Sequence, residues 1–99
     1  MWNKINKQSE ILLNQCLQKK LTVTTAESCT GGMIASSIVS ICGSSTIFKS
    51  SVVTYSNDMK SKILNIPLKL INENGAVSKI IAYNMASNVL NIMNADISI

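Results

Sequence analysis

A predicted strand that runs through a glycine-containing turn into a predicted helix constrains the fold more than any other part of the chain. Leu21–Ala26 (LTVTTA) is short and rich in β-branched residues, which is typical of a β-strand. The turn Ser28–Gly32 contains two glycines and several hydroxyl side chains, and Met33–Ile41 follows with isoleucines at helical spacing. The sequence therefore predicts a sharp change from strand to helix at this turn.

Predicted strands and helices fill the rest of the chain. Ninety-nine residues suffice for one domain at most, and no internal repeat or low-complexity block divides them. We therefore expect a single domain spanning residues 1–99. Six further elements are predicted, namely helices at Lys4–Lys20, Asp58–Leu64 and Lys79–Met93, one helical turn at Leu68–Asn72, and strands at Thr46–Tyr55 and Ala95–Ile99.

The absence of histidine and arginine excludes several kinds of site. Without histidine the chain has no Ser-His-Asp triad, no Cys-His pair and no histidine-ligated zinc or haem. Without arginine it has no bidentate group for phosphate or carboxylate. Lysine, serine, threonine, tyrosine and backbone amides must carry any chemistry, and no motif supplies the carboxylate pair that a magnesium site would need.

Charge and cysteine content favour a cytoplasmic protein that binds neither membranes nor nucleic acids. Nine lysines against five acidic residues give a net charge of +4, but the lysines are scattered and no aromatic residues are interleaved with them. The uncharged stretch Ser28–Phe48 is too rich in polar residues and glycine for a membrane span. Three cysteines without a CxxC pair, after a polar N-terminus, predict a reducing compartment.

The turn Ser28–Gly32 has two interpretations. A strand that ends in such a turn and opens a helix presents unpaired backbone N–H groups at the positive end of the helix dipole. That position attracts an anion, whether a phosphate or the oxyanion that forms during acyl transfer. Alternatively, Ser28 or Thr30 caps the helix and the glycines tighten the turn. The spacing of the residues leaves both interpretations open.

Four sequence blocks resemble the C-terminal domain of the competence/damage-inducible CinA family, and they occur in the order found in that family. They are Ala26–Gly32 (AESCTGG), Gly43–Ser45 (GSS), Val53–Asn57 (VTYSN) followed by Lys60, and Gly75–Ser78 (GAVS).

The resemblance implies a fold, an activity and an assembly. The expected fold is α/β, with three layers in which a twisted sheet lies between flanking helices. The expected activity is that of a nicotinamide-nucleotide amidohydrolase, which converts nicotinamide mononucleotide to nicotinic acid mononucleotide and ammonia. The nucleotide is then the small-molecule partner, no cofactor is implied, and family members usually form a dimer or a higher oligomer.

The resemblance also assigns roles to residues of this chain. It places the nucleophilic serine at Ser28. It places at Lys60 a lysine that can act as the base. Its tyrosine is Tyr55, whose hydroxyl could relay a proton or donate to the oxyanion. Thr30, Gly31 and Gly32 fall on the turn that holds the substrate's phosphate or amide oxygen. These roles agree with general chemistry, because a desolvated lysine can replace histidine as the base for a serine.

Three residues in or beside these blocks have competing interpretations. Lys60 is either the base or a solvated helix residue beside Lys62. Glu27, a candidate substrate-binding residue, either orients the turn or the lysine, or lies in solvent at the end of the strand. Cys29 is expected to be a small packing residue rather than an activated thiol.

The chain departs from the family after the strand predicted at Ala95–Ile99. Family members continue there into a Thr-Gly-x-Ala-Gly-Pro loop and further strands, so we expect a partial domain. That expectation implies either self-association or a second chain that supplies the missing part, since an open apolar strand edge pairs readily. Two functional classes follow: an amidohydrolase, or a non-catalytic remnant that binds a nucleotide or phosphate.

Overall fold

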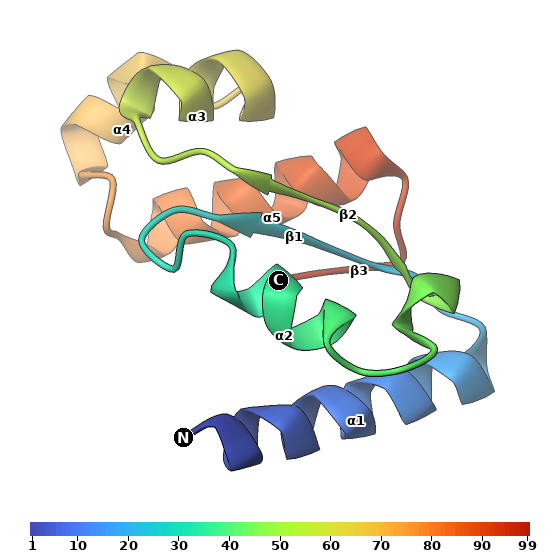
Figure 1. Cartoon of the computed structure of the whole chain (residues 1–99). Helices are drawn as coiled ribbons and strands as arrows, with labels where there is room; N and C mark the ends of the chain where they lie inside the picture. Colours follow the sequence, from blue (N-terminus) through green and yellow to red (C-terminus); the bar gives the residue numbers. More distant parts are fainter.

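Three parallel strands form the centre of the computed structural model, which describes all 99 residues. The strands are short, and helices connect and cover them (Figure 1). In chain order the elements are α1 (Trp2–Lys19), β1 (Val23–Glu27), α2 (Met33–Val39), the short 3-10 helix η1 (Ser44–Thr46), β2 (Phe48–Val53), α3 (Asn57–Leu64), α4 (Leu68–Asn74), α5 (Lys79–Met93) and β3 (Ile97–Ser98).

Strand β1 is the middle strand, in the order β2-β1-β3. It pairs in parallel with β2, from Val23 opposite Phe48 to Glu27 opposite Val53. It pairs with β3 over a much shorter length, at Val23 and Thr24. Parallel neighbours require crossover connections, and helices provide them on both sides of β1. The predicted α/β class is therefore confirmed.

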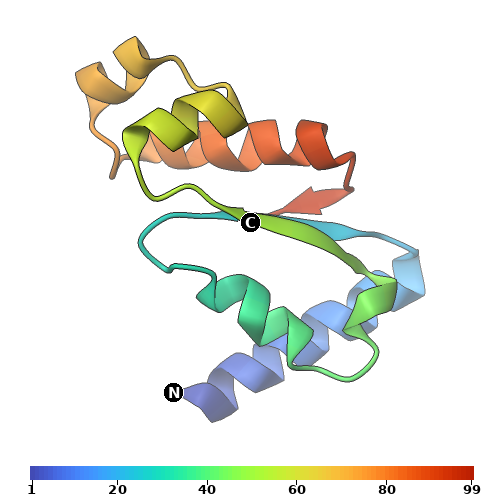
Figure 2. The ribbon, with the colours of Figure 1, turned by 45° about the horizontal axis from the view of Figure 1, so that its top comes forward.

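Helices cover both faces of the sheet. Figure 2 shows α1 and α2 on one side of the strands and α3, α4 and α5 on the other. Each side has its own group of buried apolar residues. One group is Leu13, Cys16, Val23, Ile38 and Ile47, and the other is Leu64, Ile66, Ile71, Ile81, Met85 and Val89.

Helix α5 has the bounds that the sequence predicts, because local signals define both of its ends. The Ser78 hydroxyl accepts a hydrogen bond from the Ile81 N–H at the start. Asn94 closes the helix in the left-handed conformation, at φ 51°. Between these ends, Ile81, Met85 and Val89 form a buried stripe that packs on the sheet.

Other bounds differ from the prediction where side chains compete for backbone groups. Helix α2 ends at Val39 rather than Ile41, and the Ser40 hydroxyl donates to the Ser37 carbonyl at 2.7 Å near this end. Helix α4 runs to Asn74, beyond the single turn predicted to Asn72, and the side chain of Asn74 donates to the Leu70 carbonyl at 2.9 Å.

The strands are shorter or shifted relative to the prediction. Strand β1 begins at Val23 because the Leu21 N–H still closes α1, donating to the Cys16 carbonyl. Strand β2 starts later than Thr46, since that residue belongs to η1. Strand β3 comprises Ile97 and Ser98 alone, preceded by a turn in which the Asp96 carboxylate accepts from the Thr22 N–H at 2.8 Å.

None of the helices is both long enough and apolar enough to cross a membrane.

Substitution of the buried stripe of α5 tests this packing. Ile81 is fully buried against the sheet, so Ile81→Ala should lower the free energy of unfolding by about 2–5 kcal/mol. The neighbouring Ile80 is exposed, and Ile80→Ala should change the free energy of unfolding by less than about 0.5 kcal/mol. Urea denaturation of both variants measures the difference, and equal effects would contradict the packing described here.

Candidate active site

The turn after β1 is shaped by two consecutive glycines. Gly31 and Gly32 have φ values of 60° and 98°, which lie in the left-handed region that favours glycine. The Gly31 N–H donates to the Ser28 carbonyl and the Met33 N–H donates to the Thr30 carbonyl, both at 3.0 Å. Gly32 is the N-cap of α2 and no side chain caps that helix from the N-cap position. The interpretation in which Ser28 or Thr30 caps the helix is therefore wrong.

Glu27 performs the capping from the end of β1. Its side chain is buried, and its carboxylate accepts hydrogen bonds from the N–H groups of Ile34 and Ala35 at 2.9 Å each. The hydroxyl of Thr30 donates to the same carboxylate at 2.8 Å. The solvent-exposed interpretation of Glu27 is therefore wrong, and its carboxylate is the anion held at the start of α2. Thr30 is engaged in the same network.

The hydrogen bonds to Glu27 lower the pKa of its carboxyl group. Burial of the carboxyl group by itself raises the pKa. The hydrogen bonds from the backbone N–H groups of Ala35 and Ile34, and from the hydroxyls of Thr30 and Thr25, outweigh burial and hold the pKa below its usual value. Glu27 is therefore a carboxylate at neutral pH, and the turn is fixed by charge-assisted hydrogen bonds.

Lys60 approaches the same turn from helix α3. Its side chain is 1% exposed, and its Nζ donates to the Ser28 Oγ at 3.0 Å and to the Tyr55 carbonyl at 2.9 Å. Helix α3 is set in place by Ser56, whose hydroxyl accepts from the Met59 N–H at 3.2 Å. The interpretation of Lys60 as a solvated helix residue is therefore wrong.

Tyr55 reaches this arrangement through its backbone. Its carbonyl accepts from Lys60, whereas its side chain is 76% exposed and its hydroxyl makes no hydrogen bond within the chain. Cys29 is exposed, so the expectation that it packs in the interior is wrong. The structure thus brings together the side chains of Ser28 and Lys60, with Tyr55 and Glu27 orienting the lysine and the turn respectively.

The pair of Ser28 and Lys60 has the geometry of a nucleophile and a base. A serine hydroxyl and a potential base belong within hydrogen-bond distance, with the base oriented by a third group. No carboxylate pairs with Lys60, since the ion pair of the chain is the exposed Lys69–Glu73 contact at 3.9 Å. The N–H groups of Cys29 and Thr30, which follow Ser28, make no hydrogen bond within the chain and can donate to an oxyanion.

A cavity of about 560 Å³ opens beside Ser28. Its walls come from the end of β1 and from the start of α5, including Val77, Ser78 and Ala82. The sequence assigns the block Gly75–Ser78 no role in the site, because its separation from Ser28 along the chain gives no sign that the two lie close together.

Thr54 is a second residue that the sequence did not single out. It follows β2, and its N–H donates to the Glu27 carbonyl at 2.9 Å, so it lies level with Ser28. Its hydroxyl is buried and has no hydrogen-bond partner, which is uncommon in proteins. It lies within the block Val53–Asn57, but that block gives it no role of its own.

The chain belongs to the CinA C-terminal domain family, whose sequence pattern it matches over residues 5–99. It is 46% identical to a CinA-like protein of Prochlorococcus marinus subsp. pastoris over 91 residues, which are 92% of this chain and 21% of that protein. The chain therefore spans about a fifth of the length of the curated relatives that it matches.

Solved structures show the same fold. The competence/damage-inducible protein CihA from Agrobacterium tumefaciens is 35% identical with a TM-score of 0.92, over 95% of this chain and 57% of that one. A competence-damaged protein (CinA) superfamily protein from Escherichia coli is 31% identical with a TM-score of 0.92, over 95% of this chain and 55% of that one. The expected family and fold are therefore confirmed.

Glu27→Gln tests the role assigned to the buried carboxylate. The N–H groups of Ile34 and Ala35 each donate to a different oxygen of Glu27, and glutamine has only one oxygen. The free energy of unfolding at pH 7 should therefore fall by about 1–3 kcal/mol. The matched control is Glu73→Gln in the exposed ion pair, which should change the free energy of unfolding by less than about 0.5 kcal/mol.

The pH dependence of the same measurement supplies a second check. Because folding lowers the pKa of Glu27, the carboxylate stabilises the fold above its unfolded pKa, and this contribution is lost as the pH falls through the folded pKa. The stability difference between Glu27→Gln and the native chain should therefore shrink below about pH 4. A difference that is constant from pH 7 to pH 3 would contradict the assignment.

Proposed function

We propose that this chain carries the nucleophile and base of an amidohydrolase that releases ammonia from nicotinamide mononucleotide. The observation that carries the proposal is the hydrogen bond of 3.0 Å between the buried Lys60 and Ser28. Membership of the CinA family supports it, because the resemblance of the sequence blocks implies that activity. No cofactor takes part in the proposed reaction.

The reaction follows the chemistry of a serine with a lysine base. The Ser28 Oγ attacks the carbonyl carbon of the substrate's amide as Lys60, in its neutral form, accepts the hydroxyl proton. The N–H groups of Cys29 and Thr30 stabilise the negative oxygen of the tetrahedral intermediate. When the carbon–nitrogen bond breaks, Lys60 returns the proton to the departing ammonia, which leaves an ester on Ser28.

Water then completes the reaction. Lys60 accepts a proton from the attacking water, the ester bond to Ser28 breaks, and the proton returns to the serine oxygen. The products are nicotinic acid mononucleotide and free enzyme. A buried lysine without a carboxylate partner, held by the Tyr55 carbonyl, is a setting in which lysines serve as general bases.

The remaining candidate residues have supporting roles in this proposal. Gly31 and Gly32 shape the turn, and Thr30 joins it to Glu27. Glu27 acts on the substrate only through the turn, because both of its oxygens already accept hydrogen bonds. The exposed side chain of Tyr55 is free to contact the nucleotide or to donate to the oxyanion.

The proposal includes a compartment and one alternative function. The three cysteines are unpaired, as expected in the reducing cytoplasm, where we place the reaction. The alternative is a module that binds a nucleotide or phosphate without turnover. The observation that favours it is that the chain covers only 55–59% of the solved relatives, so residues outside this part of the domain can be required for turnover.

Ser28→Ala removes the proposed nucleophile. Ammonia release from nicotinamide mononucleotide should fall to the background rate, because no ester can form, while circular dichroism should show an unchanged fold. The control is Ser36→Ala, at an exposed position of α2, which should keep full activity. The assay uses the chain alone and the chain combined with the remaining part of a relative's domain. Activity in Ser28→Ala, or no ammonia release from either native preparation, would overturn the proposal.

Lys60→Met removes the proposed base and keeps a flexible chain of similar length. The turnover number should fall at least about 100-fold, the usual contribution of a general base. Lys62→Met is the matched control, since Lys62 is an exposed residue of the same helix and should be dispensable. The thermal unfolding midpoint is measured alongside. A stable Lys60→Met variant with native turnover would require another base.

A further inference from the structure

The start of α2 already holds an anion, which is the carboxylate of Glu27. The N–H groups of Ile34 and Ala35 donate to it at 2.9 Å each, and the Thr30 hydroxyl donates to it at 2.8 Å. A phosphate at this position would meet a buried negative charge and would find these donors occupied. The N–H groups of Cys29 and Thr30 bind the amide oxygen in the proposed reaction, so a phosphate on the same substrate needs a different group.

Lysine is the side chain of this chain that can bind a phosphate by charge, because arginine and histidine are absent. Lys60 is buried and its amine already contacts the Ser28 hydroxyl and the Tyr55 carbonyl. Lys79 is the one lysine among the residues that line the cavity of about 560 Å³ beside Ser28. Its side chain is exposed and belongs to no ion pair, so its charge is available to a ligand.

The path of the chain brings Lys79 to the side of the sheet on which Ser28 lies. Helix α5 leads through a short turn into β3, which is parallel to β1. The helix therefore runs against the strands and starts at the edge of the sheet where β1 ends (Figure 1). Lys79 is the first residue of the helix, and the Ser78 hydroxyl fixes this start by donating to the Gly75 carbonyl at 2.8 Å.

The wall of the cavity that continues from Lys79 is apolar. Ala82, Met85 and Ala86 follow along α5, and all three line the cavity. At 1.5 Å per residue, Lys79 and Ala86 are about 10 Å apart along the helix axis. The α5 wall thus has a positive charge at one end and small apolar side chains along the rest. Such a wall suits a ligand that carries a flat ring and a negative group at opposite ends.

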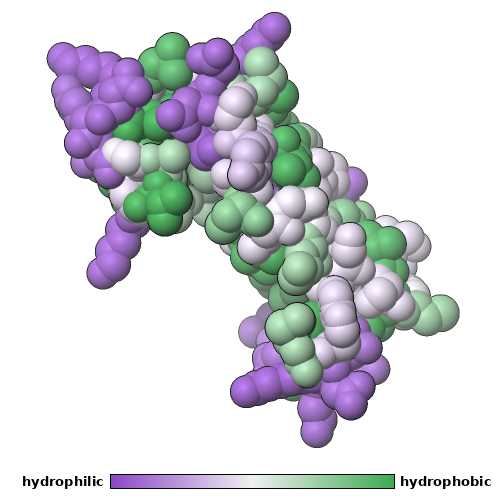
Figure 3. Space-filling model, turned by 60° about the vertical axis from the view of Figure 1, so that its left-hand side comes forward, coloured by the Kyte–Doolittle hydropathy of each residue, from purple (hydrophilic) through white to green (hydrophobic).

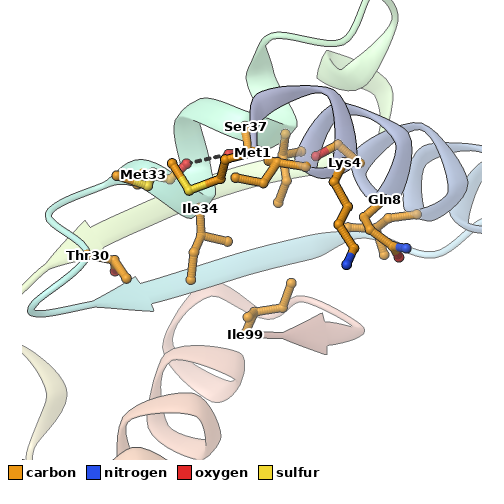
Figure 4. Close-up of a pocket in the computed structure, with 12 residues that line it drawn as sticks. Met1, Lys4, Gln8, Thr30, Met33, Ile34, Ser37 and Ile99 are labelled. Atoms are coloured by element: carbon orange, nitrogen blue, oxygen red, sulfur yellow. Dashed lines mark hydrogen bonds between the residues drawn. The ribbon is translucent and has the colours of Figure 1, made fainter.

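The surroundings of the cavity supply few competing charges. Figure 3 views the side of the molecule on which α5 starts, and apolar or neutral residues lie across the middle of this view. The acidic residue that lines the cavity is Glu27, whose carboxylate is held at the start of α2. A hollow of about 470 Å³ on the opposite face of the sheet is lined by Lys4, but Ser28 does not line it (Figure 4).

We propose that Lys79 binds the phosphate of a mononucleotide whose amide lies at Ser28, and that it thereby selects the nucleotide over the nucleoside. The identity of the amide rests on the proposed function. A phosphate monoester carries about −1.5 to −2 charges at pH 7, and an unpaired ammonium forms charge-assisted hydrogen bonds with it. Lys79 lies at the far wall of the cavity from Ser28, so it determines specificity and takes no part in proton transfer.

Kinetics with two substrates test the role of Lys79. Nicotinamide mononucleotide and nicotinamide riboside share the amide and differ by the phosphate. In the preparation that releases ammonia, Lys79→Met should raise the KM for the mononucleotide at least about fivefold and leave kcat unchanged, because the contact is the same before and during the reaction. Both constants for the riboside should keep their native values. Lys79→Arg keeps the positive charge and should restore most of the affinity for the mononucleotide.

Calorimetry with the Ser28→Ala chain measures binding without turnover. This chain should bind the mononucleotide at least about fivefold more tightly than the riboside, and adding Lys79→Met should remove the difference. Lys69→Met is the matched control, because it removes the same charge from an exposed position of α4 outside the cavity. It should leave the affinity for both ligands unchanged. Thermal unfolding verifies that each variant folds.

The outcomes separate this inference from the proposed function. Preference for the mononucleotide that requires Lys79, without ammonia release from any native preparation, supports the role of Lys79 and contradicts the hydrolase. Ammonia release with a native KM in Lys79→Met supports the hydrolase and contradicts the role of Lys79. Binding of neither ligand, equal binding of both, or a loss in Lys79→Met that affects both ligands equally would also overturn the inference.

Discussion

The buried carboxylate of Glu27 determines the geometry of the turn on which the candidate site is built. The N-cap of helix α2 is Gly32, which has no side chain to cap the helix, and Gly31 and Gly32 together leave the turn with little conformational preference of its own. Four hydrogen bonds to the Glu27 carboxylate cap the helix in place of an N-cap side chain and fix the path of the turn. Because Ser28 is the next residue, the position of its hydroxyl depends on a carboxylate that does no chemistry itself.

The parallel pairing of β1 and β2 supplies the other half of the site. Carboxyl ends of parallel neighbours lie at the same edge of a sheet, so the turn after β1 meets the corner that follows β2. Helix α3 begins at this corner, and one of its first residues is Lys60. The Lys60 Nζ and the Ser28 Oγ, from residues 32 positions apart in the sequence, are thereby 3.0 Å apart, and the Tyr55 carbonyl holds the lysine by accepting a second hydrogen bond from Nζ.

The sequence predicts the order and type of the elements because these follow from local signals. The stripe of α5 and its Ser78 cap, or the β-branched run before the first turn, require no knowledge of the rest of the molecule. The burial of Lys60 and the capping by Glu27 could not be predicted in this way. Both depend on contacts between residues whose proximity is decided by the path of the turn and by strand pairing, and a solvated lysine or glutamate has the same local sequence.

Different elements of the domain supply the proposed reacting pair and the far wall of the cavity beside it. Ser28 follows β1 and Lys60 lies on α3, which begins just after β2, so these three elements hold the pair in place. The cavity beside Ser28 has one wall from the end of β1 and another from α5. Under the proposed function the substrate lies in this cavity, so binding and selection of the nucleotide depend on α5, whereas the positions of the proposed nucleophile and base do not.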